Sequence, residues 1–242
     1  MKNTEVQRGV LYIVATPIGN LGDITLRALE ILKVVDAVLC EDTRVTGKLL
    51  ARYEIRKSMV SCHEHTDDAK LAHIVERLKQ GENLAFASDA GTPGLSDPGN
   101  KLVSLALAAD IPVVPIPGVS ALATIVSVAG IDMREFVFLG FPPHKKGRET
   151  FFRKVATMEY PVVYYESPHR VMKNLELLER LLSQENLEHL ESLGRLEGKR
   201  VIIGRELTKM FEEVLRGTIE EIRDYFTANP GKQKGEFVVI IY

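Results

Sequence analysis

Cysteine is scarce in this sequence, with only Cys40 and Cys62 among 242 residues. The two form no Cys-x-x-Cys pair, so the pattern does not indicate a structural zinc site. So few thiols favour a reducing compartment, where disulfides rarely persist. Residues 1–8 are polar and lack the apolar stretch of a signal peptide. We therefore expect a cytoplasmic protein without a bound metal.

The sequence also lacks long hydrophobic runs and an excess of either charge. Its longest apolar runs, Val10–Ala15 and Phe237–Tyr242, are strand-sized, whereas a membrane-spanning helix needs about 20 residues. Lysine and arginine number 31 against 33 acidic residues, a formal net charge of -2. This balance argues against a generally basic nucleic-acid-binding surface. A local basic patch stays open, because RNA contact requires cations on one face only.

Short apolar runs alternate with amphipathic stretches along the first half of the chain. Asp67–Lys79, for example, places Leu71, Ile74, Val75 and Leu78 at helical spacing. Such alternation favours a mainly parallel sheet covered by helices, the α/β class. The expected strands are 10–15, 37–40, 84–87 and 113–114, and the expected helices are 24–34, a stretch through 49–50, 67–79 and 101–109.

A proline-rich stretch, Ile111–Gly118, interrupts this pattern. Proline breaks helices and stiffens connections, so we place a domain boundary here, between residues 1–116 and 117–242. The second half again mixes strands and helices, and residues 183–198 are polar and expected to be exposed. Expected strands there are 136–139, 161–164, 201–203 and 237–242, and expected helices are 171–182 and 219–226.

Two turns follow expected strands and are rich in glycine and proline. Thr16–Asp23 follows the first strand, where α/β sheets place ligands, although Asp23 capping a helix would also explain part of it. Ala87–Gly99 is more informative, because its glycines allow close backbone approach to a ligand and Asp89 and Asp97 add carboxylates. A helix cap with Pro98 in its first turn is the alternative.

Two polar clusters follow the expected strands of the first half. In Glu41–Arg44, Asp42 or Thr43 fits a helix cap, whereas Arg44 has no local partner in the sequence and suits a phosphate or carboxylate. Cys62–His65 places two histidines near each other, but no further ligands stand at metal spacing. We prefer polar site residues there to a metal site.

Three clusters of charge mark the second half. Lys145 to Lys154 is a basic run that suits phosphate contacts, although a solvated loop and helix face is the plain alternative. In Tyr165–Arg170, Glu166 and His169 are candidates for a proton-accepting base, while Ser167 and Pro168 fit a helix start. In Arg205–Lys209, Glu206 and Arg205 either pair with each other or contact a ligand.

Seven motifs stand in a fixed order along the chain. They are Thr16–Asp23, Glu41–Arg44, Ser88–Gly99, Pro117–Ser120, Phe138–Phe141, Tyr165–Arg170 and Arg205–Lys209. In this combination they resemble the tetrapyrrole methylase superfamily, and within it the branch that methylates a ribose of 16S ribosomal RNA. The resemblance extends from about Gly9 to the end of the sequence.

That resemblance implies two α/β domains, with S-adenosylmethionine in the cleft between them, and a homodimer. Members of this branch often carry a further small segment beyond the last strand, and this sequence ends at Tyr242. We therefore expect weak binding to naked RNA. The implied cofactor-binding residues are Pro17, Asp89, Ala90, Gly91, Thr92, Pro93, Leu95, Ser96, Ser120, Ala121, Leu139, Gly140, Phe141 and Tyr165.

The expected reaction is methyl transfer to the ribose 2'-hydroxyl of a decoding-centre cytidine in 16S rRNA, within the small ribosomal subunit. A ribose hydroxyl needs a base, for which Glu166 and His169 are the candidates. A tetrapyrrole C-methyltransferase and a non-catalytic, cofactor-binding ribosome assembly factor are the alternatives. Candidate substrate-binding residues are Arg44, Lys145, Lys146, Arg148, Arg170, Arg205 and Lys209.

Overall fold

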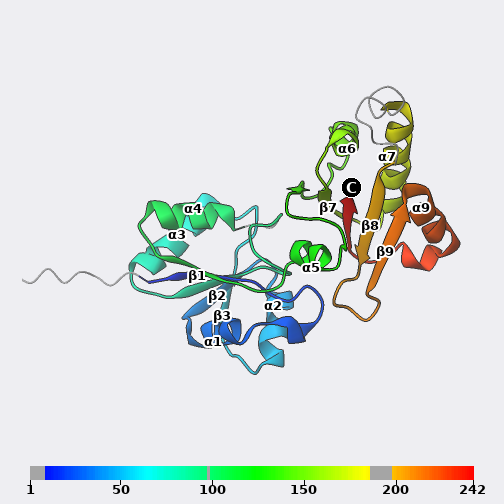
Figure 1. Cartoon of the computed structure of the whole chain (residues 1–242). Helices are drawn as coiled ribbons and strands as arrows, with labels where there is room; N and C mark the ends of the chain where they lie inside the picture. Colours follow the sequence, from blue (N-terminus) through cyan, green and yellow to red (C-terminus); the bar gives the residue numbers. More distant parts are fainter. Residues whose placement is uncertain (1–8, 97–98, 186–197) are drawn as a thin grey trace, which may run out of the picture. The chain divides into compact units, whose positions relative to one another are not determined.

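The computed structural model of this chain describes residues 9–96, 99–185 and 198–242 (Figure 1). The chain divides into two compact units, Met1–Ser120 and Ala121–Tyr242, referred to below as the N-terminal and C-terminal units. Asp97, Pro98 and most of the polar segment 183–198 lie outside the described residues. Expectations for those positions therefore stay predictions.

A parallel sheet of five strands forms the centre of the N-terminal unit, in the order β3-β2-β4-β1-β5. This arrangement confirms the parallel sheet expected from the alternating pattern. The strands are β1 (Leu11–Val14), β2 (Ala37–Cys40), β3 (Ser58–Ser61), β4 (Leu84–Ala87) and β5 (Val113–Ile116). The helices are η1 (Leu21–Asp23), α1 (Leu26–Val34), α2 (Thr43–Arg52), α3 (Asp68–Lys79) and α4 (Asn100–Ala108).

Helices cover both faces of this sheet (Figure 1). On one face, α3 and α4 pack their apolar residues against Leu11, Leu39 and Phe86. On the other face, α1 and α2 pack against Val14 and Val38. Because both faces are covered, β2 and β4 are buried at every position, which explains their continuous apolar sequences.

Side-chain caps fix where these helices begin. The Thr25 side chain accepts from the Ala28 N–H at 3.1 Å and starts α1, so the expectation that Asp23 would cap this helix was wrong. Asp42, one of the two residues expected to cap α2, does so by accepting from the Arg44 N–H at 2.8 Å. Each cap satisfies an N–H group that the first helical turn leaves without an intrahelical partner.

The C-terminal unit contains a second sheet of five strands, in the order β6-β7-β10-β8-β9. Strands β6 and β7 are parallel and the other neighbours are antiparallel. The strands are β6 (Val137–Phe138), β7 (Val162–Glu166), β8 (Arg200–Arg205), β9 (Glu213–Thr218) and β10 (Phe237–Ile241). The helices are α5 (Ala121–Ser127), α6 (Arg148–Thr157), α7 (Val171–Glu185), α9 (Ile219–Ala228) and η2 (Pro230–Lys232).

Strand β10 is central in this sheet and buried along its whole length. Three helices, α6, α7 and α9, pack against one face through a single apolar cluster that includes Phe152, Leu178 and Phe226. The other face carries α5, since a Cβ atom on Gly204 of β8 would lie 2.8 Å from Ile125 Cδ1. Helix α7 begins at Val171. The expectation that Pro168 would occupy its first position was therefore wrong.

The expected fold class, two α/β units, is thus confirmed. Among the described residues, no helix is both long enough and apolar enough to cross a membrane.

Candidate functional site

The ends of β1 and β4 are joined at the carboxyl edge of the first sheet. Thr16 and Gly91 exchange two backbone hydrogen bonds, each 2.9 Å long. The Thr16 hydroxyl donates to the Ser88 carbonyl at 2.9 Å, and the Ser88 hydroxyl donates to the Gly91 carbonyl at 2.7 Å. Both hydroxyl groups are buried, so they hold the loop after β4 in one conformation.

Left-handed backbone conformations shape the described part of this loop. Gly91 has φ +82°, Gly94 has φ +88° and Ser96, which is not glycine, has φ 64°. A Cβ atom on Gly91 would lie 3.3 Å from Ile18 Cγ2, so a side chain there would be both strained and crowded. Ala90 and Ser96 are exposed. The loop therefore presents backbone groups, rather than long side chains, at the sheet edge.

The carboxyl end of β5 reaches the same edge. The Thr92 hydroxyl donates to the Val119 carbonyl at 3.0 Å. A Cβ atom on Gly118 would lie 2.9 Å from the Cβ atom of Ala15, so the two backbone segments approach closely. Pro17 is buried beside them, and Ser120 is partly buried. Three strand ends thus meet where parallel α/β sheets bind ligands.

Asp42 and Asp89 connect this loop to the start of α2. The Asp89 carboxylate accepts from the Asp42 N–H at 3.1 Å. Arg44 donates from Nε and Nη2 to the Asp42 carboxylate, and these bonds hold the pKa of Asp42 near 2. The expectation that Arg44 has no local partner was therefore wrong. Its side chain is nevertheless 87% exposed, so part of it stays accessible to a ligand.

Glu166 is the central polar residue of the C-terminal unit. It ends β7 and is only 2% exposed. Its carboxylate accepts from the Ser167 N–H at 2.7 Å and from the Asn174 side-chain amide on α7, and it lies 3.5 Å from Arg170 Nε. The group therefore ties the turn after β7 to the helix that follows.

Burial raises the pKa of Glu166 above its ordinary value of 4.5. The bonds from Asn174 and Ser167 and the positive charges of Arg170 and Arg148 oppose this rise, without cancelling it. A carboxyl with a raised pKa suits proton transfer near neutral pH. However, its enclosure keeps both oxygens away from solvent.

The neighbouring segment 139–141 forms a continuous backbone link to β7. The Leu139 N–H donates to the Val163 carbonyl at 3.0 Å, and the Tyr165 N–H donates to the Gly140 carbonyl at 2.9 Å. The Tyr165 ring packs against the Phe141 ring with their centres 5.3 Å apart, and Phe141 is 53% exposed. An exposed aromatic face beside a fixed backbone is suited to stacking on a planar ligand.

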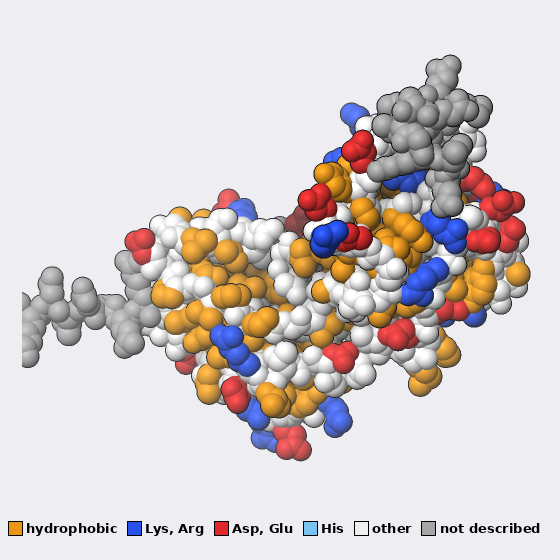
Figure 2. Space-filling view, viewed as in Figure 1, with side chains coloured by type: hydrophobic (Ala, Val, Ile, Leu, Met, Phe, Trp, Pro, Cys, Tyr) orange, Lys and Arg blue, Asp and Glu red, His pale blue; other side chains and the backbone are white. Residues whose placement is uncertain are grey.

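The basic residues predicted to bind the substrate differ in whether their side chains are exposed or already bonded to protein groups. Lys145 and Lys146 are exposed, and Arg148 is partly exposed at the start of α6. Arg170, in contrast, donates to Ser167 Oγ at 3.0 Å and to the Pro142 carbonyl at 2.9 Å. On the face drawn in Figure 2, basic and acidic side chains are intermixed rather than gathered in one broad patch.

Arg205 and Lys209 are also engaged within the C-terminal unit. The Arg205 guanidinium is buried and donates to Glu213 Oε2 at 3.2 Å and to the carbonyls of Lys234 and Phe211. Lys209 Nζ binds Glu206 at 2.9 Å and Glu236 at 2.8 Å. Arg205 therefore pairs with Glu213, and not with Glu206 as one expectation had it.

The histidines of the Cys62–His65 cluster do not come together as a set of metal ligands. The rings of His63 and His65 lie 6.4 Å apart, and both residues are exposed. No group of three or more His, Cys, Asp or Glu side chains in the described part of the chain could hold a metal ion. His169, the other candidate base, is exposed on the turn after β7.

Comparison with known sequences places this arrangement in a family. Residues 10–223 match the family described as Tetrapyrrole (Corrin/Porphyrin) Methylases. Ribosomal RNA small subunit methyltransferase I of Haemophilus influenzae is 42% identical over 96% of this chain and 78% of its own length. The protein of the same name from Borrelia garinii is 43% identical, over 96% of this chain and 98% of its own length.

Comparison with solved structures agrees on the fold. The X-ray structure of the cobalamin biosynthetic enzyme cobalt precorrin-4 methyltransferase superposes with a TM-score of 0.68, over 96% of this chain and 94% of that one. The two sequences are 16% identical, so this likeness concerns the fold alone. Fold, motif order and sequence similarity agree: the chain belongs to the tetrapyrrole methylase family, within which it groups with the ribosomal RNA small subunit methyltransferases I.

Proposed function

We propose that this chain transfers a methyl group from S-adenosylmethionine to the ribose 2'-hydroxyl of a decoding-centre cytidine in 16S rRNA. The similarity to proteins named ribosomal RNA small subunit methyltransferase I, at 42% identity over nearly the whole chain, carries the proposal. The tetrapyrrole alternative rests on relatives whose likeness extends to the fold alone. Because the proposed substrate is ribosomal RNA, we also propose that the chain works in the cytoplasm.

The residues at the first sheet edge suit the cofactor. S-adenosylmethionine carries polar groups that backbone N–H and C=O groups recognise, and the Asp89–Ser96 loop has only short side chains at its exposed positions, Ala90 and Ser96. Pro17 and Ser120 flank this loop. In the C-terminal unit, Ala121, Tyr165 and the 139–141 segment are the further candidates, with Phe141 offering a ring for stacking.

The cofactor supplies an activated methyl group on a sulfonium, so the protein mainly has to align the acceptor and remove its proton. His169 is exposed on the turn after β7 and is the candidate to accept the ribose proton. Glu166 is enclosed beneath the same turn, bonded to the Ser167 N–H and Asn174. We assign Glu166 the role of holding this turn in place.

Lys145, Lys146, Arg148 and Arg44 are the cations that we assign to RNA phosphates, since their side chains keep solvent exposure. Arg170, Arg205 and Lys209 donate to protein groups instead and serve to shape their loops. Because only these four cations are assigned to phosphates, we expect weak binding to naked RNA and better activity on an assembled small subunit. We also propose that the chain acts as a homodimer.

A labelled-methyl transfer assay tests the proposed function. The chain would be incubated with labelled S-adenosylmethionine and, separately, small ribosomal subunits, naked 16S rRNA and a precorrin. The expected result is label in the RNA of the small subunits. Label in the precorrin would favour the tetrapyrrole alternative, and cofactor binding without label in any acceptor would favour a non-catalytic assembly factor.

A further inference from the structure

Asn174 is a buried polar residue in the first turn of α7, and its side chain is bonded on one side only. It is 1% exposed. Its side-chain amide donates to Glu166 Oε2, whereas its carbonyl oxygen Oδ1 is buried without a hydrogen-bond partner among the described residues. Asparagine is a weak helix former, and a buried carbonyl without a donor destabilises a fold. Leucine would avoid both costs, so the contact with Glu166 is what explains asparagine here.

The two carboxylate oxygens of Glu166 have different partners. Oε1 accepts from the Ser167 N–H at 2.7 Å and lies 3.5 Å from Arg170 Nε. Oε2 accepts from Asn174. Asn174 is therefore the residue that fastens Oε2, and with it the end of β7, to α7.

The turn that begins at Ser167 carries His169, the residue proposed above to accept the ribose proton. The N–H groups of Arg170 and Val171 both donate to the Ser167 carbonyl at 3.1 Å, which closes the turn. Ser167 is in turn bonded to Glu166 through its own N–H. A shift of the Glu166 carboxylate would therefore displace the turn and His169 with it.

The surroundings of Glu166 act on its proton in opposite directions. Glu166 lies on the sheet face that α6, α7 and α9 cover, on the same side as Tyr164, and its partner in β10 is the uncharged Phe237. Burial there raises the pKa of Glu166, whereas the positive charges of Arg170 and Arg148 lower it. Burial also raises the pKa of Tyr164 well above its ordinary value, so that neighbour stays neutral. Glu166 is thus placed to exist both with and without its proton.

The unbonded Oδ1 allows Asn174 to serve both states of Glu166. With the carboxyl ionised, Asn174 Nδ2 donates to Oε2, as in the structure. With the carboxyl protonated, a half-turn of the amide brings Oδ1 to the same place, where it accepts from the carboxyl O–H. Because Oδ1 has no donor among the described residues, this half-turn breaks no other bond of that oxygen.

We propose that Asn174 is a positioning residue for methyl transfer, which bonds Glu166 in both protonation states and so keeps the turn with His169 in one place as the pH changes. Leucine at this position would bond neither state. Aspartate would bond only while the two carboxyls share a proton, because two ionised carboxylates repel each other. The inference rests on the proposed function, since the turn matters for catalysis only if His169 acts on the ribose.

The variation of kcat with pH, measured on the full chain with saturating small subunits, tests the proposal. Asn174→Leu should lower kcat by about 10-fold relative to wild type at every pH, as a misplaced base does. Asn174→Asp should approach wild type at low pH and lose activity progressively as the pH rises.

The double variant Glu166→Gln/Asn174→Asp reverses the hydrogen bond. Its new amide N–H donates to the new carboxylate, while its amide oxygen still accepts from the Ser167 N–H. It should therefore recover at high pH most of the kcat that Asn174→Asp loses. Failure of this recovery would overturn the proposal, even if Asn174→Leu cannot fold.

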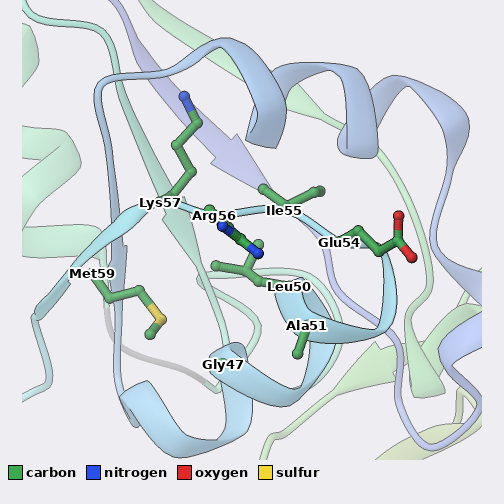
Figure 3. A pocket seen from close by; sticks show the side chains of 8 residues that line it. All are labelled: Gly47, Leu50, Ala51, Glu54, Ile55, Arg56, Lys57 and Met59. Atoms are coloured by element: carbon green, nitrogen blue, oxygen red, sulfur yellow. The ribbon is translucent and has the colours of Figure 1, made fainter.

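Two control variants lower the net charge by as much as Asn174→Asp without touching Glu166. Lys173→Gln alters the exposed residue next to Asn174 on α7. Arg56→Gln alters an exposed residue of the N-terminal unit that lines a surface pocket between α2 and the start of β3 (Figure 3). Both should retain the wild-type kcat at every pH. A loss equal to that of Asn174→Asp would make the effect one of overall charge and overturn the proposal.

Melting temperature against pH tests the Asn174–Glu166 pair without any substrate. Asn174→Leu removes a bond that favours the ionised carboxylate, so the pKa of Glu166 should rise further and stability should decline up to a higher pH than in wild type. Glu166→Gln/Asn174→Asp should melt above Asn174→Asp at high pH. A response in melting without any change in kcat would make the pair purely structural and overturn the positioning role. A wild-type chain that transfers no methyl group would refute the proposed function and the positioning role with it, whereas the melting curves would still establish the pair.

Discussion

Gly91 tests the cofactor site at the scale of a single residue. Its φ of +82° and the 3.3 Å between an added Cβ atom and Ile18 Cγ2 mean that a side chain there strains and displaces the loop proposed to hold the cofactor. Gly91→Leu should abolish the calorimetric signal of S-adenosylmethionine. Gly130→Leu is the matched control, since Gly130 has φ +71° with nothing within 4 Å of its added Cβ atom. Both variants should lose about 1–2 kcal/mol of stability, but only the first should lose binding.

Glu166 makes a prediction about pH and stability. Its raised folded-state pKa means that the folded protein binds the proton more tightly than the unfolded chain. The stabilising contribution is therefore complete below about pH 4.5 and declines as the pH rises through the folded-state pKa. Glu166→Gln should remove this decline from a plot of melting temperature against pH. A variant that retains the wild-type decline would contradict the assignment of the raised pKa to Glu166.

Kinetics of Glu166 and His169 variants distinguish a residue that positions the turn from the base that accepts the substrate's proton. A base that acts on the substrate contributes about 100-fold or more to turnover. His169→Ala should therefore lower kcat by at least that factor, whereas Glu166→Gln should change it by less than about 10-fold and affect KM as the turn loosens. Steady-state kinetics with saturating small subunits decide between the two, and the opposite ranking would make Glu166 the base.

Residue partners were the hardest feature to predict from the sequence. The Ala87–Gly99 loop stood out because its composition is unlike that of an ordinary connection. Arg205, in contrast, finds Glu213 and the Lys234 carbonyl through strand pairing and a distant loop, which no local pattern reveals. Asn174 was missed for the same reason, since only the start of α7 beneath the turn after β7 brings it to Glu166.

At the scale of elements, the basic start of α6 is the proposed RNA contact. Changing Lys145, Lys146 and Arg148 together to Ala should weaken RNA binding and lower the slope of log affinity against log salt by about 2–3. Arg27, Lys33 and Lys79 are exposed and their joint replacement removes the same charge, which makes it the matched control. Filter binding at several salt concentrations measures both, and equal slopes for the two variants would contradict a local contact.

Element prediction succeeded where burial was continuous and missed two of the four edge strands and the helices α5 and α6. Strands β2, β4 and β10 are buried at every position, so their apolar runs were unambiguous. The sequence analysis missed β3 and β9, because both lie at sheet edges and their partly exposed residues carry no continuous apolar run. Helix α5 is only 7 residues long, too short for its periodicity to stand out.

At the scale of the whole molecule, the two α/β units, the family and its ribosomal RNA branch were predicted from the sequence, whereas the ribose 2'-hydroxyl of one cytidine stays a prediction. Parallel strands alternating with helices determine the class through burial alone. The choice of RNA over a tetrapyrrole rests on the motif order and the similarity to rRNA methyltransferases, because both substrates carry negative charge and exposed cations would suit either.

The central claim is methylation of a ribose in small-subunit RNA, and mass spectrometry of nucleosides tests it most directly. Small-subunit rRNA would be digested from cells that contain this gene and from cells that lack it. The account predicts that a single 2'-O-methylcytidine at the decoding centre disappears with the gene and returns when the purified chain and S-adenosylmethionine are added to the isolated subunits. An unchanged ribose methylation, with loss of a corrinoid or sirohaem instead, would contradict it.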